Sequence, residues 1–207
     1  LKMSEIEGEY TPVKDYSMGE LEVRLRYAPN EKYYQSKSYR YPVSLDMPVF
    51  TLSHIVAHKG VMGSDYSYNC TEFGSQKRFW FSAFGYTDVI LRAGKVWDKV
   101  PFPLLLIPNA NLSYTIQPES FTQMNAMEFL NDQYVSWDVT YYANGCIFNR
   151  IPFLKKLQWR EVGTFRGWYG DLSKKNIPTA ENGLFVFPEG SYVMGKMPYM
   201  EAGVGIE

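Results

Sequence analysis

The sequence predicts an all-β protein, an antiparallel meander of about seven long strands forming an incomplete piece of a transmembrane β-barrel, with one long ordered loop. Three observations predict this class. Apolar and polar residues alternate in several separate stretches, aromatic residues make up 17% of the chain, and no stretch has the periodicity of a convincing amphipathic helix. Alternation is typical of strands with two different faces, and Tyr and Trp gather at both interfaces of membrane barrels.

The clearest alternation covers residues 20–27, where the odd positions are apolar or aromatic and the even positions are charged. A strand here has one apolar and one charged face, because successive side chains point to opposite sides. The same pattern predicts strands at residues 66–71, 87–93, 135–141 and 200–207. Two further strands are expected at 50–59 and 157–169, with breaks in the alternation near His54 and at Glu161, the latter suggesting a bulge.

The alternation also predicts what each face contacts. In a barrel, the apolar face meets lipid and the polar face lines the lumen. The outward-facing candidates are Leu21, Val23, Leu25, Val135, Trp137, Val139, Met200, Ala202, Val204 and Ile206. The lumen-facing candidates are Glu20, Glu22, Arg24, Arg26, Asp138, Glu201 and Glu207.

Residues 100–131 have a different character from the strands. Pro101, Pro103 and Pro108 surround an apolar run, and proline cannot donate to a β ladder. We therefore expect a long connection, with no more than a short helical turn at 124–130. Its apolar content predicts an ordered loop that packs against protein, and the lumen of the barrel is one place where it would do so.

A soluble β-sandwich is the alternative architecture, because sandwiches also alternate. Sandwich strands are typically about 5–6 residues long, whereas several alternating runs here reach about eight to ten residues. Mixed charge on the polar face suits a hydrated lumen, although a solvated sandwich face would look similar. Strand length therefore favours the membrane barrel.

Composition and charge exclude several functional classes. With 21 basic and 22 acidic residues the net charge is −1, which gives no clustered basic surface for nucleic acid. Cys70 and Cys146 are too few for a disulfide-dense scaffold or for a zinc site of their own, and we expect both to be small apolar fillers. The chain begins with Leu1 and stops at Glu207 in mid-alternation, so we expect the strand over 200–207 to pair with a strand that follows it.

No catalytic, metal or cofactor site is predicted. His54 and His58 would lie about 13 Å apart along a strand, too far for a shared ligand. There is no Gly-x-Ser-x-Gly elbow, and a carboxylate pair formed by Glu119 and Glu128 is better explained by hydrogen bonding within the loop. We therefore expect no enzymatic activity, no cofactor and no small-molecule substrate.

Several long strings in the chain carry a resemblance. They span residues 94–105, 114–121, 124–129, 149–152, 155–157 and 159–162, with 26–32 and 77–81 upstream. These strings resemble a family of outer-membrane proteins of Gram-negative bacteria, the carboxypeptidase-like regulatory domain-containing proteins, also described as a domain of unknown function. Its loop motif falls on Gln117, Pro118, Glu119, Met124, Asn125 and Glu128.

The resemblance implies a role as well as a location. The family's barrel is similar to the surface-antigen superfamily, which inserts or exports outer-membrane proteins. Residues 1–207 would then be one region from the C-terminal part of a bacterial outer-membrane barrel, without the N-terminal sandwich domain and the closing strand. The expected partners are the lipid bilayer and client outer-membrane proteins, whose strands would add at an exposed sheet edge.

Two other functions stay open from the sequence. The barrel would serve as a passive anchor, or as a small-solute channel, for the missing N-terminal domain. In the second alternative the chain is a soluble β-sandwich binding module.

Overall fold

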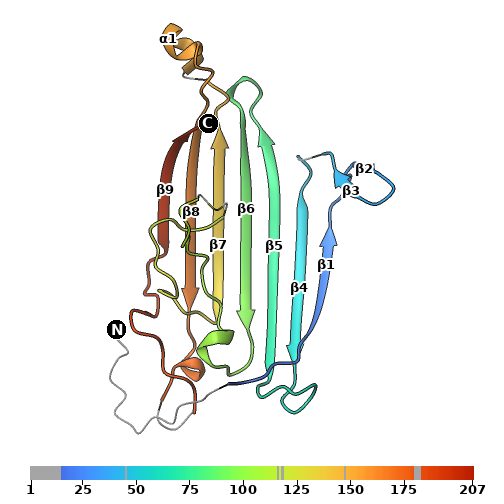
Figure 1. The fold of residues 1–207 in the computed structure, drawn as a ribbon, viewed down its shortest axis with the longest axis vertical. Helices are drawn as coiled ribbons and strands as arrows, with labels where there is room; N and C mark the ends of the chain where they lie inside the picture. The colour runs from blue at the N-terminus through green and yellow to red at the C-terminus, as the bar shows by residue number, and fades with distance from the viewer. Residues whose placement is uncertain (1–14, 45, 116, 118, 147, 180–182) are drawn as a thin grey trace.

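The computed structural model describes residues 15–44, 46–115, 117, 119–146, 148–179 and 183–207. Its main element is a seven-stranded antiparallel sheet in the order β1-β4-β5-β6-β7-β8-β9 (Figure 1). The strands are β1 (Leu21–Tyr27), β4 (Val49–Ala57), β5 (Tyr68–Trp80), β6 (Tyr86–Val96), β7 (Gln133–Tyr142), β8 (Glu161–Asp171) and β9 (Tyr199–Ile206). The predicted all-β meander of about seven strands is therefore confirmed.

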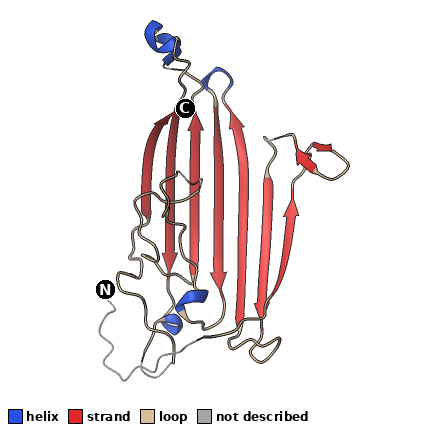
Figure 2. Ribbon diagram, viewed as in Figure 1, coloured by secondary structure: helices blue, strands red, loops and turns tan. Residues whose placement is uncertain are grey.

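The remaining elements are short and lie in the connections. Between β1 and β4, a separate hairpin is formed by β2 (Tyr33–Gln35) and β3 (Arg40–Pro42). The helical pieces are η1 (Ser82–Phe84), η2 (Phe102–Leu104), η3 (Phe148–Arg150), α1 (Pro152–Lys155) and η4 (Lys174–Asn176). Figure 2 shows that they sit at the two ends of the sheet, outside its strands.

An unbroken register runs across all seven strands of the sheet. Each strand pairs with its neighbour without a skipped residue, from the β1–β4 ladder to the β8–β9 ladder. Side chains that share a row therefore point to the same side through the whole sheet. The register places the charged and the apolar sets of the sequence on opposite faces.

We define the apolar face by the exposed residues Leu21, Val23, Leu25, Leu52, Phe73, Leu91, Val135, Phe165, Tyr169, Met200, Val204 and Ile206. Trp137 and Val139 of β7 also lie on this face and are half-buried among their neighbours. The opposite side, which carries Asp88, Asp138 and Arg166, is the polar face.

The breaks in alternation have explanations other than those expected. The β4 ladder continues through His54, which stays on the apolar face with its Nδ1 3.0 Å from Thr71 Oγ1. The next residue, Ile55, lies on the polar face because it packs against the buried core there. The predicted bulge at Glu161 is wrong, since β8 begins at that residue and residues 157–160 belong to the preceding connection.

The core lies between the polar face and the connections that fold over it. One buried cluster includes Val96 of β6 together with Val100, Leu106 and Leu130 of the β6–β7 connection, and Leu172 just after β8. Phe102 and Leu104 are partly buried against the same cluster. The expected packing against protein is therefore confirmed for Phe102, Leu104 and Leu106, whereas Leu112 and Tyr114 of the same loop are exposed. The helical turn expected at 124–130 is wrong, because this stretch contains a turn at 126–127 and one isolated β-bridge, at Phe129, but no helix.

Candidate functional site

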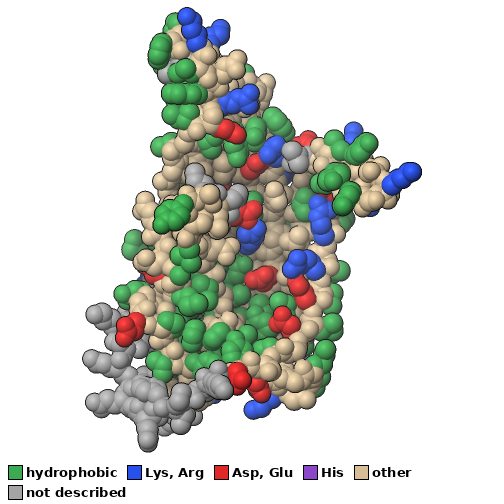
Figure 3. Space-filling model, viewed as in Figure 1, with side chains coloured by type: hydrophobic (Ala, Val, Ile, Leu, Met, Phe, Trp, Pro, Cys, Tyr) green, Lys and Arg blue, Asp and Glu red, His purple; other side chains and the backbone are tan. Residues whose placement is uncertain are grey.

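The candidate site is the polar face together with the loop of residues 100–131 that lies on it. Strand register places the following predicted residues on this face: Glu22, Arg24 and Arg26 of β1, Asp138 of β7 and Glu201 of β9. Glu20 comes just before β1 and Glu207 just after β9, so neither is inside a strand. That these side chains line a lumen stays a prediction. Figure 3 shows acidic and basic side chains gathered over the middle of this face.

Two ion pairs join neighbouring strands on the polar face. Arg166 of β8 lies directly opposite Asp138 of β7, with Nε and Oδ2 2.6 Å apart and each side chain only 14% exposed. Arg78 of β5 binds Asp88 of β6 through two hydrogen bonds. Its Nε donates to Oδ1 at 2.6 Å and its Nη2 donates to Oδ2 at 2.7 Å. Opposite charges placed across an antiparallel pair stabilise it, so these pairs also strengthen the register.

Two arginines of the sheet bind the loop just past its midpoint, at residues 119 and 120. Arg92 of β6 forms an ion pair with Glu119. Arg166 uses its second nitrogen, Nη1, to donate to the backbone carbonyl of Ser120 at 2.7 Å. Arg166 therefore satisfies a charge on the sheet and a backbone acceptor in the loop at the same time.

Glu201 of β9 holds the next part of the loop. Its carboxylate accepts the backbone N–H groups of Thr122 at 2.9 Å and of Gln123 at 2.8 Å, as well as the hydroxyl of Thr122 at 3.1 Å. Tyr199, two residues earlier on the same strand, donates its hydroxyl to this carboxylate at 2.8 Å. Hydrogen bonds to an ionised carboxylate are stronger than neutral ones, so Glu201 is a firm anchor.

Apolar contacts also hold this part of the loop against the polar face. Phe121 and Met124 are buried in a cluster with Trp168 of β8 and Met194. Tyr134 of β7 stacks on Trp168 with ring centres 4.0 Å apart and planes 8° from parallel. A cavity of about 70 Å³ lies between this part of the loop and the sheet. The loop therefore covers part of the polar face closely.

Other residues of the loop motif have local roles. Met124 is buried against the sheet, as described above. The carboxylate of Glu128 accepts the backbone N–H of Asn125 at 2.9 Å and so closes a turn within the loop. Gln117 is exposed, and Pro118 lies outside the described residues.

A buried polar group ties two connections together at the end of the sheet where the loop begins. Asp132 Oδ2 accepts the backbone N–H of Ser173 at 3.1 Å and the side-chain amide of Asn176 at 2.9 Å. Asn176 in turn accepts the backbone N–H of Val100 at 3.0 Å. Sequence reasoning missed this group, because its members are far apart in the chain and lie outside the strands.

The histidines and cysteines are separate from these contacts. His54 contacts Thr71 on the apolar face, and His58 follows the end of β4. Cys70, which is buried, and Cys146 are free thiols. Over the described ranges, no group of three or more His, Cys, Asp and Glu residues could hold a metal ion. The expected lack of enzymatic activity stays a prediction.

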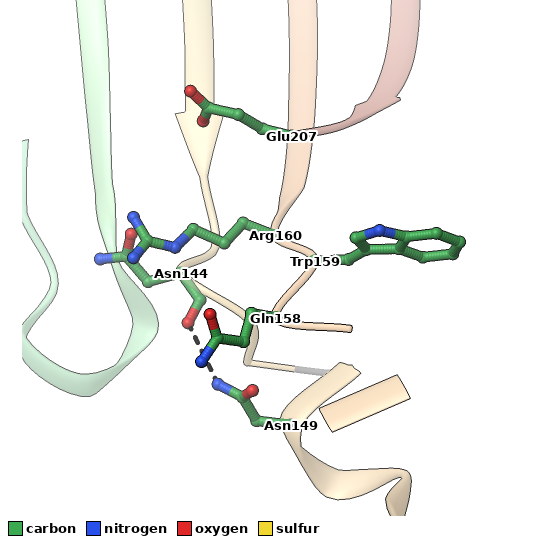
Figure 4. A pocket seen from close by; sticks show the side chains of 6 residues that line it. All are labelled: Asn144, Asn149, Gln158, Trp159, Arg160 and Glu207. Atoms are coloured by element: carbon green, nitrogen blue, oxygen red, sulfur yellow. Dashed lines mark hydrogen bonds between the residues drawn. The ribbon is translucent and has the colours of Figure 1, made fainter. Parts of the chain in front are cut away.

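An open pocket of about 630 Å³ lies at the opposite end of the sheet from Asp132. Its lining residues are Asn144, Asn149, Gln158, Trp159, Arg160 and Glu207. In Figure 4, Arg160 extends toward Asn144, whereas Trp159 points the other way. The amide of Asn149 reaches the backbone carbonyl of Asn144 at 3.5 Å. The pocket is an open space, lined mainly by polar side chains, at the base of the β7–β8 connection.

The fold and the site define an all-β protein built on one two-faced antiparallel sheet, with an ordered loop fixed to its polar side. Within the described residues, no helix has the length and apolar character needed to cross a membrane. The chain belongs to the family of unknown function DUF5686, whose C-terminal domain matches residues 4–175. No curated protein and no solved structure matches the chain. The likeness to carboxypeptidase-like regulatory domain-containing proteins and to the surface-antigen superfamily stays a prediction.

Proposed function

We propose that the chain forms part of a transmembrane β-barrel in the bacterial outer membrane, with its apolar face against lipid and its polar face toward the interior. The observation that carries this proposal is the exposed apolar face. Large aliphatic and aromatic side chains run across it from β1 to β9, and Val204 is 96% exposed. Contiguous apolar patches of this kind are rare on soluble monomers, because water makes them costly, whereas lipid removes that cost.

The loop contacts also favour a membrane over a second sheet. A soluble sandwich covers its apolar face with another sheet. In the part of the chain that the structure describes, the β6–β7 connection folds over the polar face instead, with anchors at Arg92, Arg166 and Glu201. The apolar face is thus left for a partner as apolar as itself.

Strand length supports the same proposal. A strand that crosses the hydrocarbon core of a membrane at a tilt needs about 9–11 residues. The central strands β5, β6, β7 and β8 have 13, 11, 10 and 11 residues. Phe79 and Tyr141 lie at one end of the apolar face, as expected where a barrel surface reaches a membrane interface.

The polar face suits the interior of such a barrel. Its charges are neutralised in pairs, as in Arg166–Asp138 and Arg78–Asp88. The loop fills space above β7, β8 and β9, which favours a partly plugged interior over an open solute channel (Figure 1). Among the described strands, β1 and β9 have one neighbour each, so further barrel strands would pair at these edges.

For the role of the barrel, we propose that it assists the assembly, insertion or export of other outer-membrane or surface proteins. This role is the one predicted from the expected similarity of the family's barrel to the surface-antigen superfamily. The edges at β1 and β9 support it, because a client strand would add at a sheet edge by β-augmentation. Depletion of the full-length protein should then lower the amounts of particular outer-membrane proteins. If every outer-membrane protein keeps its level, the barrel is better described as a passive anchor.

The barrel proposal is tested by two neighbouring positions on β7. Val139→Cys lies on the apolar face and Thr140→Cys on the polar face, in a background with Cys70→Ala and Cys146→Ala. We expect a spin label at 139 in the membrane-bound full-length protein to collide with oxygen, which concentrates in lipid. A label at 140 should collide more with a water-soluble nickel complex.

The pair is matched because adjacent strand residues have the same depth but opposite directions. Equal accessibility of both labels to the nickel complex would contradict a lipid-facing surface. So would recovery of the full-length protein in the soluble fraction of the cell.

A further inference from the structure

The connection between β7 and β8 projects beyond the end of the sheet, carrying η3 and α1 (Figure 1). We call residues 148–160 the tip. It contains four basic residues, Arg150, Lys155, Lys156 and Arg160. No acidic residue occurs anywhere from 139 to 160, so the tip has a strong positive charge for its size.

Apolar side chains alternate with these cations and are left exposed. Phe153 is 73% exposed, and Ile151, Leu157 and Trp159 are each more than 40% exposed. Figure 3 shows green and blue side chains together over this projection. An exposed cluster that combines aromatic, aliphatic and basic side chains has the composition of segments that lie in a membrane interface.

The cations of the tip have no acidic partner in the described part of the chain. The ion pairs of the sheet and of the β1–β2 connection leave Arg150, Lys155, Lys156 and Arg160 uninvolved. The closest acidic residue after them in the chain, Glu161, accepts the backbone N–H of Phe148. Arg160 extends into the pocket that Glu207 also lines. Arg150, Lys155 and Lys156 are exposed, so these three cations provide the outward charge of the tip.

We propose that the tip docks on the anionic headgroups of the bilayer beside the barrel, with Phe153 and Trp159 entering the interface and the cations binding lipid phosphates. This inference rests on the proposed membrane barrel. The connection that carries the tip leaves β7 at Tyr142, next to Tyr141 at the end of the apolar face, so the tip lies beyond that end, on the side where headgroups would lie. Basic segments next to a membrane surface are attracted to anionic lipids, and aromatic side chains are favoured at the interface.

The test places an environment-sensitive fluorophore on Phe153→Cys in the full-length protein, with Cys70→Ala and Cys146→Ala. The protein is reconstituted in vesicles of phosphatidylcholine alone or with one third phosphatidylglycerol. Because both leaflets have the same lipids, the direction of insertion does not affect the result. We expect a blue shift of the fluorophore only with phosphatidylglycerol, and its reversal by high salt, which screens exposed charges.

A charge-reversal pair and a matched control distinguish specific docking from a general charge effect. Lys155→Glu with Lys156→Glu should abolish the blue shift. Lys59→Glu with Lys196→Glu makes the same change in net charge at exposed positions in the connections at the other end of the sheet, and should leave the shift intact. Loss of the shift in both pairs would overturn the assignment to the tip.

Two further outcomes would overturn the proposal. An equal blue shift in both lipids would show that apolar contact suffices and that the cations have no role. In the other outcome, the fluorophore keeps the emission of a water-exposed probe in both lipids and shifts to the blue only when a soluble protein fraction is added. That result would assign the tip to a protein partner. The spin label at position 139 is measured in the same vesicles. If that label lies in lipid while the tip stays outside the headgroups, the docking proposal fails but the barrel proposal holds.

Discussion

Two consecutive long connections of this protein differ in whether they pack against the sheet. The β6–β7 connection folds back over the polar face, and its Leu130 is 0% exposed. The β7–β8 connection projects from the other end of the same strands, and its Phe153 is 73% exposed. Both are rich in apolar residues, so apolar content alone does not determine whether a loop packs against the sheet.

The difference lies in what each connection offers to the sheet. The β6–β7 connection supplies Glu119 to Arg92 and backbone N–H groups to Glu201. The β7–β8 connection carries four cations and no carboxylate. Polar contacts with the sheet therefore fix the β6–β7 connection, and apolar burial adds to its stability. The charges of the β7–β8 connection are directed to the proposed outside partner.

The largest expected effect comes from removing a buried apolar side chain in the first connection. Leu130→Ala should lower the free energy of unfolding by about 2–5 kcal/mol, because a cavity replaces a fully enclosed side chain. Leu157→Ala in the tip, where the side chain is 42% exposed, should change it by less than about 0.5 kcal/mol. Unfolding of the full-length protein in detergent micelles measures both. Similar decreases in the free energy of unfolding for the two variants would contradict the difference in packing between the connections.

An intermediate effect is expected from the anchor on β9. Glu201→Gln weakens the hydrogen bonds to Thr122 and Gln123 and should cost about 1–2 kcal/mol of local stability. Amide exchange of the loop should then become about 5–30 times faster. Glu22→Gln on β1 is the control, since within the described residues the carboxylate of Glu22 bonds to exposed Arg24 and not to the loop. Unchanged exchange in the Glu201 variant would mean that apolar contacts alone seat the loop.

The smallest effect concerns the exposed end of the sheet. The hydrogen-bonded guanidinium of Arg26, with help from the Tyr33 hydroxyl, lowers the pKa of Glu31 to about 2. Since the folded pKa is depressed, this contact contributes stability above the ordinary pKa of Glu and loses it as the pH falls toward 2. NMR titration should give a pKa near 2 in the native protein and a value closer to the ordinary range in Arg26→Gln. A pKa that does not change in the variant would exclude Arg26 as the cause.

The strands could be predicted from the sequence because alternation is a local property. The runs near residues 20–27, 135–141 and 200–207 match β1, β7 and β9 to within a residue or two. The full length of β5 was missed beyond residue 71, where its two faces become similar in polarity. The β2–β3 hairpin was missed because each of its strands has only 3 residues, which is too short for alternation to be recognised.

The polar contacts were predictable only in part. Asp138 and Glu201 could be found as charged residues inside alternating runs. Their partners could not, because the choice of Arg166 for Asp138 depends on a register between separate strands. The attachment of Thr122 to Glu201 depends on how a 79-residue separation is closed in three dimensions, which no local pattern contains.

The unbroken register limits how the length of this protein can vary over evolution. Inserting one residue within a strand would turn every later side chain of that strand to the other side. An insertion before Trp137, for example, would send Asp138 toward the apolar face, away from Arg166. Insertions and deletions are therefore expected in the connections, where the tip and the β2–β3 hairpin can lengthen or shorten without disturbing either face. Related chains should differ in loop length while their strands keep a constant number of residues.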